Sequence, residues 1–556
     1  MKSLSFLLVT LVACGGTHDN VNSPVAPVAA AGGPTTSRPT ASGDVSFELA
    51  AAKIEGVVYE PEAITRPGVP LVDSKKSISL EKQRALVQSA KDPVVKQAQA
   101  AVLATMLYKE SKGGKAKDKE EEKLKEARQV VRDVAQQVGD KAIDEITLQL
   151  IGSYELVLAD YAVAEKAAGY AAAEKAWAKL IEIDAKSKEL PTYRTWLAYS
   201  LLKQFKNTEA LAAVGTDKLD DKQPELAYMA AWARFRTGDG PGAWQAIAVA
   251  AKGWGQNAKR DELERDALLI AARAGIPLDQ AQVLLTTVFV PPNAAPPKAK
   301  LELQSNLIAK LGLAGYGNAG QWAEGVAALD KAIALGGDSV PPTDRVVIAY
   351  QQADFTIRLD SPEVAAKYAK QAIDAIGKCD GKCDKRTTAD VALGVNLMGR
   401  LFHTLYATAN DKRYYQPAHD LYEITIPLLA DPATKAQATK DAKILETTLK
   451  NIKPGTGTHD KGALGTLLGR HNPEVQACYE AALGGNPKLG GTITVTFESD
   501  ATGAIKGAAT EPAAGLTGLA QVAGCVGEHA KRWMLPKRGM AGTTRIKASY
   551  ALALKK

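Results

Sequence analysis

Histidine and cysteine are scarce in this chain, whose 556 residues include six histidines and five cysteines. These residue types supply most transition-metal ligands and many nucleophile and base pairs of enzymes. His403 lies in an apolar helical stretch and His419 stands beside Asp420, and neither has the spacing of a metal site or a catalytic pair. We therefore predict no catalytic residue, no metal site and no cofactor, and the protein is not expected to be an enzyme.

An excess of one charge sign is also nearly absent. The 69 Lys and Arg residues outnumber the 62 Asp and Glu residues by seven, and no dense basic stripe carries the interleaved aromatics that nucleic-acid binding needs. A nucleic-acid partner is not expected, and no small-molecule substrate is indicated. Apolar residues make up 46% of the chain, and a single hydrophobic core stops growing at roughly 250–300 residues. We predict at least two globular parts.

Long apolar runs are missing, because no segment approaches the ~18 consecutive apolar residues of a membrane helix. A short apolar run at residues 5–13 follows a positively charged start and indicates an export signal over residues 1–13. Residues 11–14 (LVAC) resemble a bacterial lipobox, which implies cleavage before Cys14 and lipidation of its thiol. Gly15 then implies transport to the outer membrane, with the protein facing the periplasm. The alternative is an ordinary secretory signal followed by a stray cysteine.

Two segments separate this anchor from the folded part. Residues 14–43 are mainly Pro, Gly, Ser, Thr and Ala, a composition typical of a flexible tether. Residues 44–76 form an extended lead-in that contains the strand-like Val57-Val58-Tyr59 and several turn-forming prolines. The sequence does not define a role for this lead-in.

Residues 77–453 are rich in Ala, Leu, Lys and Glu, and apolar residues recur every three or four positions. This pattern predicts a series of consecutive helices. Three stretches resemble the second helix of the tetratricopeptide repeat, in which a small residue stands between large ones. Weaker copies carry their small residue at Ala210, Ala243, Ala281 and Ala365, so the small positions stand 33 to 53 residues apart. The three stronger matches are Tyr170, Ala173 and Trp177; Trp322, Gly325 and Leu329; and Tyr415, Ala418 and Tyr422.

A small residue lets two helices approach closely while its large neighbours fill the space between stacked hairpins. The resemblance to tetratricopeptide-like proteins implies a concave surface for peptides or partner proteins. An irregular helical domain with accidental alanine spacing is the alternative. The G-x-G-x-x-G pattern at 315–320 follows a helical stretch instead of a strand, so we interpret it as an inter-helix turn and not as a nucleotide site. The charged stretch 112–125 is interpreted as a solvated loop and helix face.

Apart from Cys14 the cysteines are even in number, namely Cys379, Cys383, Cys478 and Cys525. In an exported protein this number favours two disulfides. Cys379 and Cys383 bracket a turn centred on Gly381 and can be brought together there. Free thiols and a metal site with additional ligands remain alternatives for this pair.

Residues 459–556 follow a different pattern, which predicts a helix, two strands, a helix and a final strand. This stretch resembles the AgmX/PglI-type C-terminal domain of gliding-motility and other envelope proteins, which is similar to the TonB C-terminal domain. Leu535 stands where the family usually has Phe. The likeness rests on Cys478-Tyr479-Glu480, Gly491 to Phe497, the hairpin at Asp500 and Gly503, Cys525-Val526, and Trp533 with Pro536.

The resemblance implies that Cys478 and Cys525 face each other between the two helices and form a disulfide. It also implies partner binding through pairing of an exposed strand with an incoming peptide, a mode that uses backbone hydrogen bonds. The candidate edge strand is Ile546 to Leu552. The expected fold is mainly α, a tetratricopeptide-like helical solenoid followed by a small α+β TonB-C-like domain.

These observations predict a non-enzymatic, lipid-anchored periplasmic scaffold or adaptor in a cell-envelope complex. Its partners would be envelope proteins or peptides, and the membrane contact would be the N-terminal lipid. Gliding motility is the process that the C-terminal resemblance suggests. A receptor or assembly factor for an outer-membrane transporter is one alternative, and an uncharacterised envelope enzyme is another.

Overall fold

A computed structural model of the chain describes residues 44–555 with short internal gaps. The predicted signal peptide 1–13, the lipidation site Cys14 and the tether 14–43 lie outside the described residues. The gaps within 44–555 are 65–67, 73–77, 114–116, 140–141, 162–165, 216–218, 256–258, 291–296, 410, 448–458, 460, 513–516 and 538–541.

The chain divides into two compact units that do not follow the predicted domain boundaries. The helical unit comprises residues 60–270, and the sheet unit comprises residues 44–59 together with 271–555. The division falls inside one helix of the predicted repeat region. The predicted lead-in 44–76 is shared between the two units, because its first part pairs with the C-terminal strands.

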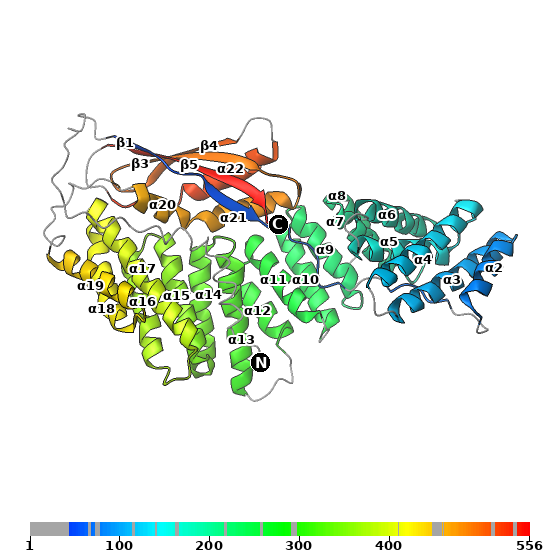
Figure 1. The fold of residues 1–556 in the computed structure, drawn as a ribbon, viewed down its shortest axis with the longest axis horizontal. Helices are drawn as coiled ribbons and strands as arrows, with labels where there is room; N and C mark the ends of the chain where they lie inside the picture. The colour runs from blue at the N-terminus through cyan, green and yellow to red at the C-terminus, as the bar shows by residue number, and fades with distance from the viewer. Residues whose placement is uncertain are drawn as a thin grey trace. The chain divides into compact units, whose positions relative to one another are not determined.

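The helical unit consists of helices joined by short connections (Figure 1). Neighbouring helices pack in pairs, α3 with α4, α5 with α6, α7 with α8, and α9 with α10. Its described helices are α2 (Leu80–Ser89), α3 (Pro93–Gly113), α4 (Lys117–Val138), α5 (Glu145–Tyr161), α6 (Lys166–Ile183), α7 (Leu190–Lys203), α8 (Asn207–Val214), α9 (Pro224–Arg236), α10 (Gly240–Trp254) and α11 (Arg260–Arg273), which crosses the division.

The sheet unit continues with helices of the same kind before the chain reaches the sheet. The glycines at 315–320 lie in and just after a π-helical stretch, η3 (Leu311–Gly317), that follows α13 directly and precedes α14. The interpretation as an inter-helix turn therefore holds for Gly320, whereas Gly315 and Gly317 extend the preceding helix. The helices are α12 (Leu278–Val288), α13 (Pro297–Lys310), α14 (Trp322–Gly336), α15 (Pro342–Arg358), α16 (Pro362–Gly377), α17 (Lys385–Ala409), α18 (Tyr415–Thr425) and α19 (Pro432–Thr447).

The small residues singled out in the sequence are buried, and each lies on an even-numbered helix from α6 to α18. Their large neighbours are buried as well, except Tyr415, which is partly exposed. At Gly325 a side chain has no space, since a Cβ there would lie 2.7 Å from the Phe355 ring. The small residues are Ala173, Ala210, Ala243, Ala281, Gly325, Ala365 and Ala418.

The predicted order of helix, two strands, helix and strand is present from α21 to β5. The elements are α21 (Asn472–Leu483), β3 (Gly491–Ser499), β4 (Ile505–Pro512), α22 (Thr517–Ala530) and β5 (Thr544–Leu554), preceded by the additional helix α20 (Lys461–Gly469). In Figure 1, α20 and α21 lie between the sheet and the helices of the same unit. The described residues are mostly helical, with one small mixed sheet.

The sheet contains two strands from the other end of the chain, β1 (Val45–Glu48) and β2 (Ala52–Gly56). Both pair in parallel with β5, β1 from Val45 opposite Thr544 and β2 from Ala52 opposite Tyr550. On its other side β5 pairs antiparallel with β3, which pairs antiparallel with β4. The strand order is β1-β5-β3-β4, with β2 beside β5.

The prediction that Ile546 to Leu552 is an edge strand is therefore wrong, because β5 has neighbours on both sides. A partner peptide was expected to form hydrogen bonds with this strand. Instead β1 and β2, which lie about 500 residues earlier in the chain, form them, with Val45 opposite Thr544. Among the described strands, β4 pairs only with β3, apart from one bridge between Ala504 and Met534. β4 is thus one edge of the described sheet, and β1 and β2, which pair only with β5, form the other.

We call α20 to β5, together with β1 and β2, the sheet region of the sheet unit. Its core forms between one face of the sheet and helices α21 and α22. Alternate residues of β3 and β5 are buried, as expected for a sheet with one covered face. The chain approaches α21 closely at the end of β2, where a Cβ on Gly56 would lie 2.6 Å from the Tyr479 ring. Glycine at this position lets the N-terminal strand pack directly on the aromatic core.

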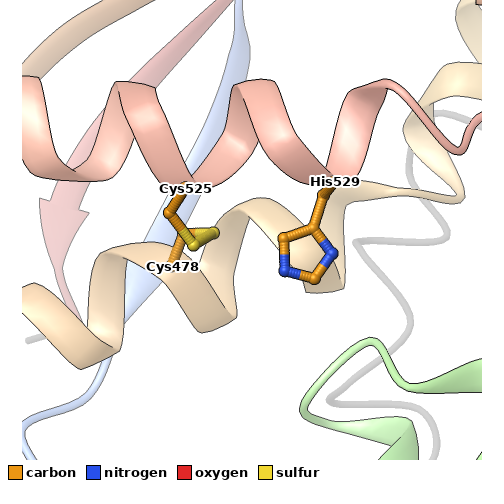
Figure 2. Close-up of side chains that lie close together, drawn as sticks. All are labelled: Cys478, Cys525 and His529. Carbon is orange, nitrogen blue, oxygen red and sulfur yellow. A yellow bond between two sulfur atoms is a disulfide. The ribbon is translucent and has the colours of Figure 1, made fainter. Parts of the chain in front are cut away.

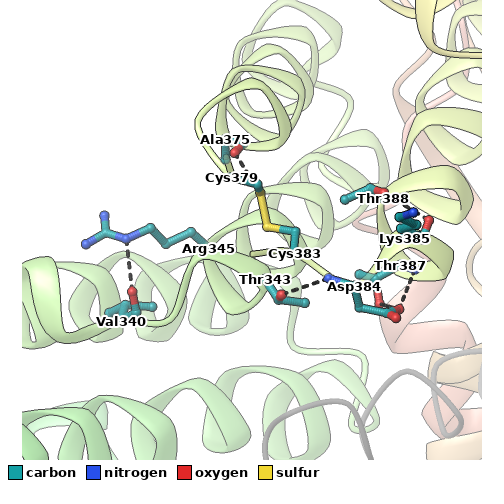
Figure 3. Close-up of a disulfide and its surroundings, with 10 residues drawn as sticks. All are labelled: Val340, Thr343, Arg345, Ala375, Cys379, Cys383, Asp384, Lys385, Thr387 and Thr388. Atoms are coloured by element: carbon teal, nitrogen blue, oxygen red, sulfur yellow. Dashed lines mark hydrogen bonds between the residues drawn. A yellow bond between two sulfur atoms is a disulfide. The ribbon is translucent and has the colours of Figure 1, made fainter. Parts of the chain in front are cut away.

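The four described cysteines are joined in the two pairs that the sequence analysis favours. Cys478 of α21 is bonded to Cys525 of α22, with their Cα atoms 5.8 Å apart (Figure 2). Cys379 at the end of α16 is bonded to Cys383, with Cα atoms 5.4 Å apart (Figure 3). In this structure both pairs are disulfides.

Removal of the Cys478–Cys525 bond is expected to destabilise the sheet region by roughly 4 kcal/mol in the chain-entropy picture, because the bond spans 47 positions. Cys478→Ser, Cys525→Ser and the double variant should cost similar amounts, since each loses the same bond. The measurement is urea unfolding followed by circular dichroism. The control is Cys383→Ser, which opens a loop of only 4 positions and should cost less. Additive costs of the two single changes would contradict the prediction.

Candidate protein-binding surfaces

A buried carboxylate, Glu474 at the start of α21, joins the sheet region to the helical repeats of its own unit. It accepts a hydrogen bond from the Trp322 indole nitrogen of α14 at 2.6 Å. The indole nitrogen of Trp533 donates to the same carboxylate, and His471 Nδ1 lies 3.2 Å from it. The His471 ring also stacks on Trp533, with centroids 4.4 Å apart. The carboxylate is thus shielded from water and held by three groups.

A charged cluster next to it makes a second connection. The Arg358 guanidinium lies 4.4 Å from the centre of the Trp322 ring and donates to the Arg470 carbonyl at 2.7 Å. Arg470 in turn donates to Asp354 at 2.7 Å. Burial opposes ionisation of Asp354, but the two arginines outweigh it and lower the pKa of this carboxyl. Two planar cations therefore fix α15 to the turn between α20 and α21.

Glu480, one helical turn and a half further along α21, holds the N-terminal segment just after β2. Its carboxylate accepts from the backbone N–H of Val57 and from the Tyr59 hydroxyl, both at 3.1 Å. It also pairs with Arg273, which lies over the Tyr59 ring and donates to the Ala477 carbonyl at 3.1 Å. The predicted strand-like stretch at 57–59 is thus fixed by side chains and is not part of a strand.

Glu474→Ala should lower the free energy of unfolding of the sheet unit by about 2–5 kcal/mol, because two buried indole N–H groups lose their acceptor. The matched control is Glu528→Ala on α22, whose side chain is 72% exposed and pairs only with Lys531. This control should change stability by about 0.5 kcal/mol at most. Chemical unfolding monitored by tryptophan fluorescence measures both. Equal costs for the two variants would contradict the assigned role of Glu474.

The helical unit holds a non-helical stretch of the lead-in, residues 60–64, against its helices. We call it the cis segment. Lys203 at the end of α7 pairs with Glu60, and Arg265 of α11 pairs with Glu62 at 2.5 Å. The Tyr228 hydroxyl of α9 accepts from the backbone N–H of Ala63 at 2.9 Å. Three helices thus contribute one polar contact each.

A buried acid, Asp266 of α11, orients the group that contacts the backbone. The Tyr228 hydroxyl donates to Asp266, and Arg265 donates to the same carboxylate at 2.7 and 3.1 Å. Burial raises the pKa of Asp266 to about 6, while Arg265 and Tyr228 act to lower it. Burial, followed by the charge of Asp266, also raises the pKa of Tyr228. The Tyr228 hydroxyl therefore stays protonated, and its lone pairs remain for the Ala63 N–H.

An open pocket of about 570 Å³ lies beside the cis segment in the helical unit. Within it Asp160 accepts from the Tyr199 hydroxyl at 3.1 Å and from Tyr170. Burial, followed by the nearby carboxylate, raises the pKa of Tyr199. Tyr170, predicted as a repeat-packing residue, thus also borders this pocket. The lining is Pro61, Glu62, Ile64, Asp160, Lys166, Tyr170, Tyr199, Lys203, Lys259 and Glu262.

The raised pKa of Asp266 leads us to expect that the stability of the helical unit depends on pH. Its pKa is about 6 in the folded state and about 3.9 in an unfolded chain. Between these values the folded state binds more protons, so the stability of the helical unit should fall as pH rises from about 4 to about 6 and then level off. The total contribution is at most about 3 kcal/mol.

Asp266→Asn retains an oxygen acceptor for Tyr228 and should lack this part of the pH profile. Hydrogen-exchange protection of the α9 amides, corrected for intrinsic rates, reports on the helical unit separately from the rest of the chain. Parallel pH profiles for the two proteins would show that Asp266 does not titrate in this range.

The two histidines discussed in the sequence analysis, and one further histidine, lie against other side chains of the fold. His403 is buried, with Nδ1 3.2 Å from the Tyr422 hydroxyl, and burial lowers its pKa. His419 lies near Asp420 and Glu446, the latter at 3.1 Å. His529 lies beside the Cys478–Cys525 bond (Figure 2), where the two sulfur atoms already bind each other.

Sequence reasoning missed the roles of three buried acids, Glu474, Glu480 and Asp266, although Glu480 was named as part of the family likeness. A usable signal was present, because each stands at helical spacing from core residues. Asp266, for example, is three residues after Leu263 and four before Ile270, both buried. A carboxylate on the apolar face of a helix indicates a buried polar contact, although its partners cannot be identified locally.

Comparison with known proteins adds little to this description. No protein-family model matches the sequence, and no curated protein matches it. Among solved structures, the chain is similar to the apo form of the quorum sensor NprR from B. thuringiensis, at 16% identity over 59% of this chain and 94% of that chain, with a TM-score of 0.22. A TM-score this low does not define a shared fold. Within the described residues, every helix is too short or too polar to cross a membrane.

Proposed function

We propose that this protein is a lipid-anchored periplasmic adaptor that holds partner proteins in a cell-envelope complex. The main observation in support of the proposal is that residues 60–64 are bound against helices of the helical unit. Three helices hold this non-helical stretch through one backbone and two carboxylate contacts, made by Tyr228, Lys203 and Arg265. A surface that can hold a peptide segment in this way is suited to binding proteins.

Resemblance supports the finer assignments within this proposal. In this proposal the helices with buried small residues from Ala173 to Ala418 form a tetratricopeptide-like array, and the burial of those residues supports it. The sheet region, with its Cys478–Cys525 bond, belongs in this proposal to the AgmX/PglI-type, TonB-like class. In such a domain a partner strand would pair with β4, because β5 is already covered by β1 and β2. Gliding motility is the process that this class suggests.

The anchor can be tested on Cys14. Cys14→Ala should abolish labelling by a fatty-acid probe and release the protein from the membrane fraction or leave its signal uncleaved, because the acceptor thiol is absent. Cys379→Ser, which changes a different cysteine, should leave labelling and fractionation unchanged. Membrane association without labelling of the wild type would refute the lipid anchor.

Partner identity can be tested by crosslinking in intact envelopes. Purification of the crosslinked full chain should recover envelope proteins, and a photo-crosslinker at Lys506 on β4 should capture a subset that a crosslinker at Lys175 on α6 does not. Both residues are exposed. Identical sets from the two positions, or no envelope protein at either, would contradict the adaptor function.

A further inference from the structure

The cis segment is bound through both its backbone and its side chains. Pro61, Ala63 and Ile64 are buried, whereas Glu62 is exposed. The contacts of the segment are a backbone N–H on Tyr228 and two carboxylates on Lys203 and Arg265. Any peptide with acidic residues two positions apart, followed by a small residue, can make the same contacts.

The receiving groups are organised within the helices themselves. Arg265 and Tyr228 both contact the buried Asp266, so their side chains are oriented by α9 and α11 and not by the segment. A hydroxyl that donates to a buried carboxylate presents its lone pairs for an incoming N–H. This arrangement resembles a preformed site, which reduces the entropy lost when a ligand binds.

The pocket beside the segment offers room and charge for a longer ligand. Its lining includes Lys166, Lys203 and Lys259, and besides Glu62 of the segment itself it has two acids, Glu262 and Asp160, of which Asp160 is held by two tyrosines. Positive side chains around the segment favour acidic ligands over basic ones. The Glu62 and Ile64 side chains form one wall, so a peptide that replaced the segment could extend into the same space.

We propose that this surface of the helical unit is the binding site for an acidic, non-helical peptide of a partner protein, of the type Glu-x-Glu-small. Residues 60–64 occupy it in cis and compete with that partner. The inference rests on the proposed adaptor function and specifies the partner's chemistry. A segment tethered in this way competes at an effective concentration on the order of millimolar, so only a strong or multivalent partner displaces it.

The test uses the full chain and a fluorescent peptide with the sequence of residues 57–66. The cis segment is weakened by Glu60→Gln together with Glu62→Gln. The peptide should bind this double variant at least ten times more tightly than it binds the wild type, by fluorescence anisotropy. Adding Arg265→Glu to the double variant should reduce binding at least tenfold, whereas Lys175→Glu, an exposed position on α6, should not.

A charge exchange makes the contact specific. The Arg265→Glu chain should prefer a peptide in which Glu62 is replaced by Lys over the natural peptide, because the ion pair is restored in reverse. Equal binding to wild type and double variant, or binding indifferent to Arg265→Glu, would overturn the proposal. Unfolding of the double variant, seen by circular dichroism, would also overturn it, because the segment would then be an integral part of the fold. Failure of the anchor test at Cys14 leaves this measurement unaffected.

Discussion

The burial of the Glu474 carboxylate is the interaction on which the sheet unit depends. A carboxylate removed from water is costly unless its oxygens are hydrogen-bonded. Here two indole N–H groups and His471 meet that requirement, one indole coming from α14 and the other from the end of α22. Each of these donors would in turn be unsatisfied without the carboxylate. The sheet region and the helical repeats of this unit are therefore coupled parts of one fold, and the predicted separation at about residue 453 does not divide them.

The same chemistry fixes the N-terminal segment along its length. Glu480 accepts the Val57 N–H directly, and Asp266 orients the Tyr228 hydroxyl that accepts the Ala63 N–H. Before these points, β1 and β2 pair with β5 through backbone hydrogen bonds. Recognition of the segment thus combines its backbone with acidic side chains, since Glu60 pairs with Lys203 and Glu62 with Arg265. The backbone contacts tolerate sequence change, whereas the ion pairs select for acidic residues.

Pairing of β1 and β2 with β5 has a consequence for the proposed envelope role. A C-terminal domain that binds partners by strand pairing needs an open edge, and here one side of the sheet is covered by the chain's own N-terminal strands. Of the strands near the C-terminus, β4 is the one that lies at an edge. Segments from 44 to 64 thus cover one candidate binding edge in the sheet unit and one candidate site in the helical unit. At both places the chain's own N-terminal residues occupy the surface.

Local patterns were sufficient for much of this structure. Helical periodicity predicted the helices, and the spacing of small residues predicted positions such as Ala173 and Ala418 that are buried. Alternation predicted β3 and β5. What local patterns could not predict is which distant groups meet. Val45 and Thr544 are 499 positions apart, and Trp322 and Glu474 are 152 apart. From the sequence one can tell that a strand requires pairing strands and that a buried acid requires hydrogen-bond donors. Only the tertiary structure decides which ones, because that choice depends on how the whole chain packs.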